Sequence, residues 1–186
     1  MTAPDDKEPY DPQLSILVGG GLYTLLIVGG VVWLWSRDRL ELLRTQSLGT
    51  HGLPAAVGVG LGTGILGAVL VALLAKRLPV LGRLEGKVRG MFAPMGDVAL
   101  LTLVLVGAIA EEVFFRLAVQ DAFGLAGSVA AYVLVNSTTA GWAWIPITAL
   151  HATVFGLLMQ FGFGLLGTTL ANAVLNYLCL RRILST

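Results

Sequence analysis

The feature that most constrains this chain is a long stretch without charge: from Ala122 to Leu180 the sequence contains no Asp, Glu, Lys or Arg. A water-soluble domain carries about 25% charged residues, most of them on its surface. Here only 12% of the residues are charged and 56% are hydrophobic. A fold that faces water on all sides could not cover its surface with such a stretch. The sequence therefore predicts a polytopic membrane protein.

Six stretches of the chain are apolar and long enough, or nearly so, to form transmembrane helices. A helix that crosses the bilayer needs about 20 mainly apolar residues. The predicted spans are residues 14–35, 53–75, 98–120, 126–139, 146–161 and 165–180. The last two could instead form one helix, because only Gly162, Gly164 and Gly167 separate them. The expected fold is all-α, a polytopic transmembrane helix bundle with about six spans.

The first half of the chain predicts two anchor helices and a basic linker. The second span contains five glycines between residues 58 and 67. Small residues let helix backbones approach closely, so we expect this helix to pack in the interior of the bundle. Residues 76–97 mix basic residues with Leu and Val and predict an interfacial segment. We divide the chain into residues 1–95, the anchor helices and linker, and residues 96–186, the functional core.

The distribution of Lys and Arg predicts the orientation of the bundle. Segments of a membrane protein that lie in the cytoplasm carry an excess of these residues. With six spans and the N-terminus inside, the inner segments hold eight Lys and Arg and the outer segments hold three, Arg37, Arg39 and Arg44. Both termini are therefore expected in the cytoplasm.

Several classes of function are excluded by composition. The net charge is +1 and no basic stripe is interleaved with aromatic residues, which argues against a nucleic-acid partner. The single Cys179 cannot form an intramolecular disulfide or a cysteine-based metal cluster. No glycine-rich loop ends in Lys-Ser or Lys-Thr, so nothing indicates an ATPase. A zinc site needs three protein ligands, which here only one membrane His and two Glu could supply. We therefore expect neither a metal nor another cofactor.

Charged residues of the predicted membrane region gather on the segment 98–120. An ionisable side chain at membrane depth costs roughly 2.5–3.5 kcal/mol, so Glu111, Glu112 and Arg116 should face the protein interior or a water-filled cavity. Glu112 and Arg116 are four residues apart on one helix face and can form an ion pair. Glu111 points about 100° away from Glu112 and lacks such a partner. A carboxyl in a site of low dielectric constant suits a general base or acid, which makes Glu111 the first candidate for catalysis.

The run Ala-Glu-Glu-Val-Phe-Phe-Arg at residues 110–116 resembles the Glu-Glu-x-x-x-Arg signature of the CAAX-protease and bacteriocin-processing family of intramembrane endopeptidases. This family includes type II CAAX prenyl proteases and bacterial bacteriocin-immunity proteins, and the resemblance covers about residues 97–184. It implies that Glu111 activates a water molecule, with histidine partners, for attack on a peptide bond. It also implies that Glu112 and Arg116 fix the site. The expected location is the bacterial inner membrane, and the expected substrate is a peptide or membrane protein.

The two other motifs of that family, Phe-x-x-x-His and His-x-x-x-Asn, are altered in this chain. In the second, Asn172 stands at the position of the His, and Asn176 keeps the Asn. For the first there are two interpretations. Tyr132 and Asn136 match it in spacing, with Tyr for Phe and Asn for His. Alternatively, His151 supplies the histidine in a later segment that lacks the Phe.

Three hypotheses for the function follow. In the first, the chain is an intramembrane glutamate-type endopeptidase with Glu111 as base and His151 as proton partner. Asn136, Asn172 and Asn176 would then donate hydrogen bonds to a water molecule or an oxyanion. In the second, the chain is a catalytically inactive relative that acts as a membrane scaffold or immunity-type protein, as Asn at both His positions favours. In the third, it is a small transporter in which Glu111 carries protons, although the chain has few other polar residues for a pathway.

Overall fold

The computed structural model describes residues 12–140 and 145–185, and every regular element among them is a helix. The predicted all-α class is confirmed. The elements in chain order are α1 (Pro12–Ser36), α2 (Leu42–Thr45), α3 (Gly52–Ala75), α4 (Pro79–Phe92), α5 (Asp97–Glu111), η1 (Glu112–Val119), α6 (Gln120–Ala140), α7 (Ile145–Gln160) and α8 (Gly164–Ser185).

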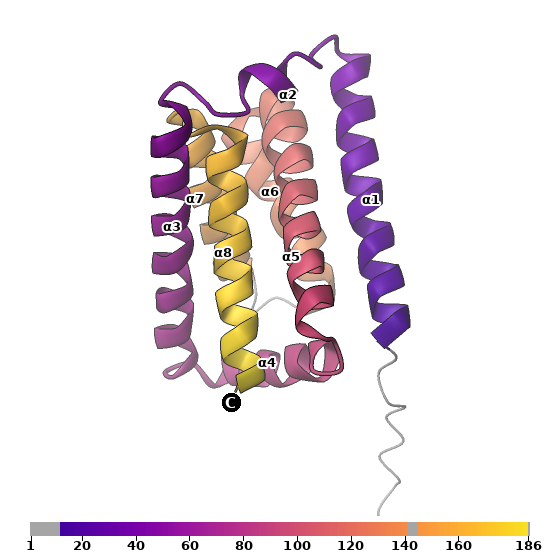
Figure 1. Ribbon diagram of the computed structural model, residues 1–186, viewed down its shortest axis with the longest axis vertical. Helices are drawn as coiled ribbons and strands as arrows, with labels where there is room; N and C mark the ends of the chain where they lie inside the picture. Colours follow the sequence, from indigo (N-terminus) through magenta and orange to yellow (C-terminus); the bar gives the residue numbers. More distant parts are fainter. Residues whose placement is uncertain (1–11, 141–144, 186) are drawn as a thin grey trace, which may run out of the picture.

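The long helices pass back and forth between two ends of the bundle (Figure 1). At the end that carries α2, the backbone N–H of Thr50 donates to the carbonyl of Gly162 over 2.8 Å and joins two connections. At the other end, α4 lies across the bundle, and Arg182 of α8 forms an ion pair with Glu85 of α4. The start of α1 and the end of α8 lie at this second end (Figure 1).

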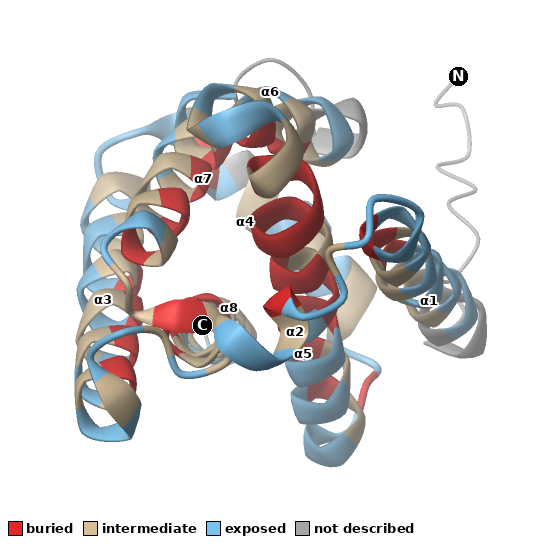
Figure 2. Cartoon of the chain, turned by 90° about the horizontal axis from the view of Figure 1, so that it is seen from above, coloured by how far each residue is buried: buried red, intermediate tan, exposed pale blue. Residues whose placement is uncertain are grey.

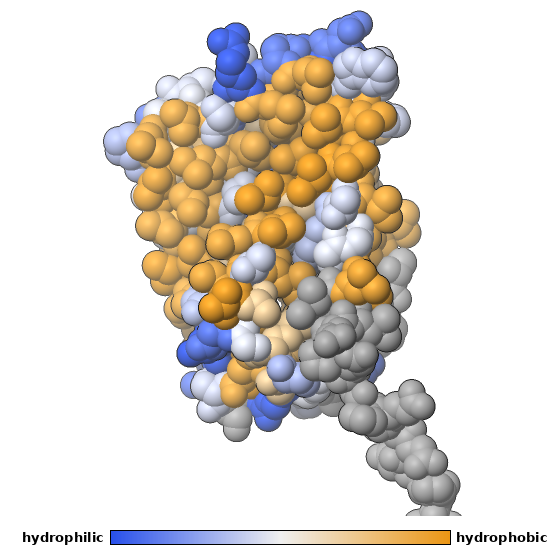
Figure 3. Space-filling view, turned by 45° about the vertical axis from the view of Figure 1, so that its right-hand side comes forward, coloured by the Kyte–Doolittle hydropathy of each residue, from blue (hydrophilic) through white to orange (hydrophobic). Residues whose placement is uncertain are grey.

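Three helical stretches of the described chain are long and apolar enough to cross a membrane: Leu17–Ser36, Gly52–Arg77 and Asp97–Asn136. The third has 40 residues and runs through α5 and η1 into α6, where the backbone departs from helical geometry at Gly124 (φ 70°, ψ −176°). α7 is apolar but shorter. A broad apolar band covers the side of the molecule, with hydrophilic residues at its ends (Figure 3). The helical membrane bundle is thus confirmed, although only three stretches meet the length and hydropathy of a span.

Two glycines of α3, Gly60 and Gly64, lie on the face of this helix that packs against α8. A Cβ atom added to Gly60 would lie 2.6 Å from the carbonyl oxygen of Gly167, and one added to Gly64 would lie 2.8 Å from that of Ala171. α3 and α8 therefore approach closely along these faces. Much of the rest of α3 is apolar and exposed or half-buried, as Leu66 illustrates with 71% exposure. The expectation that α3 packs in the interior of the bundle is wrong. Its glycines indicate that one neighbouring helix approaches closely, but they do not indicate how many helices surround α3.

α4 lies within residues 76–97, the segment that the sequence predicts to be interfacial. Pro79 stands in its first turn, where a missing backbone N–H costs no hydrogen bond. Leu81 is buried, whereas Lys87 and Arg89 are exposed. Arg89 Nε donates to the carbonyl of Ile183 over 2.9 Å and fastens α4 to the end of α8.

Two of the three arginines at the α2 end share one carboxylate. Arg37 Nη1 lies 2.8 Å from Asp121 Oδ2, and Arg39 Nη2 lies 2.7 Å from Asp121 Oδ1. Because one carboxylate faces two guanidinium groups, this end carries less net positive charge than the arginine count alone indicates.

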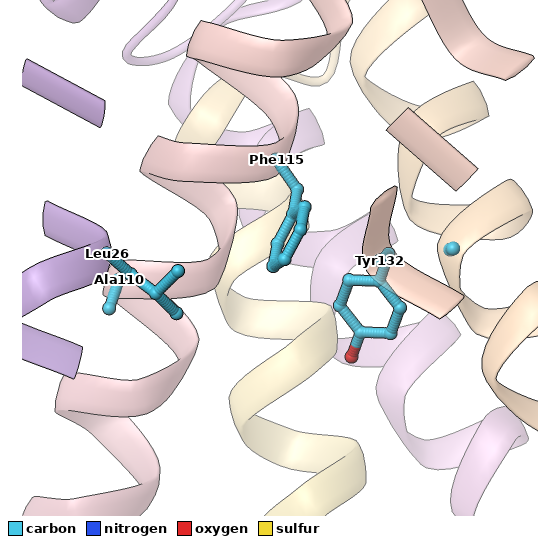
Figure 4. Close-up of a cluster of buried hydrophobic side chains, with 5 residues drawn as sticks. Leu26, Ala110, Phe115 and Tyr132 are labelled. Carbon is cyan, nitrogen blue, oxygen red and sulfur yellow. The ribbon is translucent and has the colours of Figure 1, made fainter. Parts of the chain in front are cut away.

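Buried residues concentrate on the helix faces that point toward the middle of the bundle, and α1 stands at its edge (Figure 2). One buried cluster joins α1 to α5, η1, α6 and α7. It consists of Leu26, Ala110, Phe115, Tyr132 and Ala152 (Figure 4). This cluster fixes α6 against the charged segment of the chain.

Candidate active site

The charged segment begins where α5 changes into the π-helix η1. In a π-helix the backbone hydrogen bonds run from residue i to i+5, and such turns are frequent at functional sites. Every residue of η1 except Phe114 is buried. An α-helix would point Glu111 and Glu112 about 100° apart. At this junction both carboxylates come within hydrogen-bond distance of one side chain of α8, Asn172.

Glu112 and Arg116 form a fully buried ion pair. Arg116 Nε lies 3.3 Å from Glu112 Oε2, and both side chains have 0% exposure. The pairing expected from their spacing is present. Arg116 Nη1 also donates to the hydroxyl of Ser128 over 2.7 Å, and that hydroxyl donates to the carbonyl of Phe115 over 2.8 Å. The pair is therefore tied to α6 as well as to its own helix.

The side-chain amide of Asn172 connects the two carboxylates. Its Nδ2 donates to Glu111 Oε2 over 3.0 Å and to Glu112 Oε1 over 2.9 Å. Its Oδ1 accepts a hydrogen bond of 2.6 Å from Nδ2 of Asn176, one turn further along α8. Asn172 is 1% exposed, so these contacts form in the interior of the protein.

Glu111 has partners, contrary to the expectation from its spacing. It accepts hydrogen bonds from the hydroxyl of Tyr132 over 3.1 Å and from Asn172 over 3.0 Å. Both donors come from other helices, which spacing along one helix does not report. Both bonds fall on Oε2, and no described side chain donates to Oε1. Glu112 is completely buried, whereas Glu111 is half-buried and borders a cavity.

The cavity beside Glu111 has a volume of about 280 Å³. Its polar end is formed by Glu111 with Tyr132, Asn136, His151 and Asn176. Toward α4 it is lined by the apolar residues Leu84, Val88 and Phe92 and by the ion pair of Glu85 with Arg182. A water molecule takes up about 30 Å³ in the liquid. The cavity therefore has room for a water molecule beside Glu111 together with part of a larger ligand.

Asn136 and His151 line this cavity but stand apart from the hydrogen-bond network. Asn136 Nδ2 donates to the carbonyl of Tyr132 in its own helix over 3.0 Å. The ring of His151 stacks on Phe155, with centroids 6.1 Å apart and planes 9° from parallel. No hydrogen bond between described atoms links either side chain to Glu111. The candidate residues thus fall into a hydrogen-bonded set on α5, η1 and α8 and a second set, Asn136 on α6 and His151 on α7, that lines the same cavity.

Two polar contacts of the site were not expected from the sequence. From the sequence, Tyr132 is expected only as the counterpart of a motif Phe, and no contact is expected for Ser128. The signal that could have found them is their spacing, because residues four apart share one face of α6.

Among the described residues, no three or more His, Cys, Asp or Glu side chains are grouped so that they could hold a metal ion.

Comparison with known families supports the resemblance seen in the sequence. Residues 95–182 match the model of a family described as type II CAAX prenyl endopeptidase Rce1-like. This range runs from just before α5 nearly to the end of α8 and contains the whole hydrogen-bond network. No curated protein and no solved structure matches the chain. The resemblance inferred from the Glu-Glu-x-x-x-Arg run is confirmed.

Proposed function

We propose that this chain, whose residues 95–182 form a type II CAAX prenyl endopeptidase Rce1-like domain, is an intramembrane endopeptidase. In this proposal Glu111 activates a water molecule that attacks a peptide bond of a membrane-associated substrate. The observation that carries the proposal is the position of Glu111. One of its oxygens is held by two donors, and its side chain borders a cavity with room for water.

The reaction needs one base, one proton donor and a group that stabilises negative charge. Glu111 would take a proton from water as the water oxygen attacks the carbonyl carbon of the peptide. The amide of Asn136, on the wall of the same cavity, is available to the oxyanion that forms. The C–N bond breaks when the leaving nitrogen receives a proton, either from protonated Glu111 or from His151 across the cavity.

Glu112 and Arg116 would serve this reaction without touching the substrate. Their ion pair is buried, and it holds Asn172 on one side and Ser128 on the other. Fixed donors of this kind keep a catalytic group in one geometry during the reaction.

The proposed setting is the bacterial inner membrane, with both termini in the cytoplasm. The excess of Lys and Arg at the α4 end of the bundle supports this orientation. Residues 1–95 would act as the anchor and residues 96–186 as the catalytic core.

A catalytically inactive membrane scaffold is the second candidate, and one observation favours it. Asn stands at 136 and 172, where the related signature has His, and an amide cannot exchange a proton near pH 7. In that case the network around Arg116 would be a clamp that holds η1, α6 and α8 together.

Peptide cleavage by purified protein in lipid vesicles separates the two functions. A library of membrane-proximal peptides is incubated with wild type, with Glu111→Gln and with Glu41→Gln, which alters an exposed carboxylate near α2. If the chain is an endopeptidase, wild type and Glu41→Gln cleave the peptides and Glu111→Gln does not, because the introduced amide cannot take a proton from water. A wild type indistinguishable from Glu111→Gln contradicts the enzyme and favours the scaffold.

A further inference from the structure

Among the described residues, Tyr132 is the only one whose hydroxyl group donates a hydrogen bond to Glu111. We propose that Tyr132 is a positioning residue for the proposed reaction: its hydroxyl and the Asn172 amide together hold Oε2 of Glu111, so that Oε1 is the oxygen that takes the proton from water. This inference rests on the proposed function and assigns a role to the hydroxyl group by which Tyr132 differs from the Phe of the related signature.

The hydrogen bonds on Glu111 carry the first step. Tyr132 donates to Oε2 over 3.1 Å and Asn172 donates to the same oxygen over 3.0 Å. Two donors from different helices, α6 and α8, therefore meet at one carboxylate oxygen. A carboxylate held in this way cannot rotate without losing both bonds. Its other oxygen keeps one direction, which is the condition for a base to meet a water molecule repeatedly in the same geometry.

The ring of Tyr132 is fixed on more than one side. It packs edge-on against Phe115, with centroids 5.0 Å apart and planes at 69°. The guanidinium carbon of Arg116 lies 5.4 Å from the centre of the ring, within the range of a cation–π contact. The residue is 7% exposed, and Figure 4 shows its ring beside that of Phe115. The direction of the hydroxyl is thus set by packing as well as by the hydrogen bond.

The register of α6 against η1 is set at two points one helical turn apart. Ser128, which is fully buried, accepts from Arg116 and donates to the carbonyl of Phe115. Tyr132 follows four residues later on the same face and reaches Glu111. The first contact fixes the position of α6, and the second uses that position to hold the carboxylate.

The test is a comparison of Tyr132→Phe with wild type, Glu111→Gln and Tyr177→Phe, in vesicles and with the peptide that wild type cleaves best. Tyr132→Phe removes one oxygen and keeps the ring. Tyr177 lies half-buried on α8 against Val104, Ala108 and Ala173, does not itself line the cavity, and controls for the loss of a phenol. The measured quantities are kcat, KM and the thermal unfolding temperature of each protein.

We expect Tyr132→Phe to lower kcat about 10- to 100-fold, the worth of one hydrogen bond to a charged group. KM should stay within about twofold, because the hydroxyl does not bind substrate. The unfolding temperature of Tyr132→Phe should fall by no more than a few degrees, the effect of one lost hydrogen bond. Tyr177→Phe should match wild type in all three quantities.

Each other outcome decides against the inference. An unchanged kcat in Tyr132→Phe, with an active wild type and an inactive Glu111→Gln, overturns the role of Tyr132 and leaves the proposed function standing. A variant that fails to fold, or whose unfolding temperature falls in step with its activity, assigns the hydroxyl to stability and also overturns the role. A wild type no more active than Glu111→Gln overturns the proposed function and, with it, this inference.

Discussion

Asn176 donates a hydrogen bond from its Nδ2 to Oδ1 of Asn172 over 2.6 Å, and this bond decides which way the Asn172 amide faces. With its oxygen occupied, Asn172 presents its nitrogen to Glu111 and Glu112. The two asparagines are four residues apart on α8 and share one face of that helix. Asn176 therefore determines a contact with the carboxylates that it does not itself make.

Asn176→Asp tests this control of orientation. A carboxylate only accepts hydrogen bonds, so it would face Oδ1 of Asn172 with no donor between them. Either that oxygen loses its partner, or the amide turns and brings its oxygen against Glu111 and Glu112. We expect the free energy of unfolding to fall by about 1–3 kcal/mol. Unfolding in mixed micelles measures it, and equal stability of the variant and wild type would contradict the proposed orientation.

Gly60→Ala tests the close contact between α3 and α8. The added Cβ would lie 2.6 Å from the carbonyl oxygen of Gly167, so one of the two backbones must move. We expect the free energy of unfolding to fall by about 1–3 kcal/mol. Gly58→Ala is the matched control, because a Cβ at Gly58 would meet no atom within 4 Å. It should leave stability unchanged or raise it by up to about 1 kcal/mol. Equal effects of the two changes would refute the contact.

Those parts of the structure that depend on local spacing could be predicted from the sequence. The helices follow from the lengths of apolar stretches, and the Glu112–Arg116 pair follows from a separation of four residues. The break between α7 and α8 occurs where Gly162 and Gly164 stand, and both have positive φ angles, 80° and 69°, that favour glycine.

Features that depend on contacts between distant segments could not be predicted. The hydrogen bond from Asn172 to Glu111 joins residues 61 positions apart, and no pattern within one helix encodes it. The π-helical geometry of η1 likewise leaves no mark in the residues 112–119, since each of them also occurs in α-helices. The exposure of α3 depends on which helices stand beside it, and not on its glycines.

Arg116→Met tests the importance of the buried ion pair. Without the guanidinium, the charge of the fully buried Glu112 keeps only the Asn172 amide, and breaking such a pair costs about 3–5 kcal/mol. Glu111→Gln preserves shape, so its abundance in membranes should exceed that of Arg116→Met. In Glu112→Gln/Arg116→Met no buried charge remains, and the new amide oxygen can still accept from Asn172. This double variant should recover much of the lost abundance, as quantitative blotting of membrane fractions would measure. Equal abundance of Arg116→Met and Glu111→Gln would contradict the pairing.

The orientation of the bundle is testable by cysteine labelling from either side of the membrane. In a Cys179→Ser background, Thr45→Cys marks the α2 end, and Ser185→Cys and Lys87→Cys mark the α4 end. All three positions are exposed. We expect the last two to be labelled only from the cytoplasm and Thr45→Cys only from outside, because Lys and Arg are in excess at the α4 end. Labelling of Thr45→Cys and Ser185→Cys from the same side would refute the arrangement of passes.

His151→Ala tests which group delivers the proton to the leaving nitrogen. His151 lines the same cavity as Glu111, and a general acid–base group contributes typically about 10²- to 10⁴-fold to a reaction rate. If His151 is the donor, its removal should lower kcat about 100-fold or more while Glu111 still binds water. His51→Ala is the matched control, because the His51 ring nitrogen Nε2 bonds to the carbonyl of Phe161 at the other end of the bundle, 2.9 Å away, and borders no part of the cavity. Its activity should equal that of wild type. An active His151→Ala would instead mean that Glu111 returns the proton it took, so that one carboxyl serves as base and then as acid.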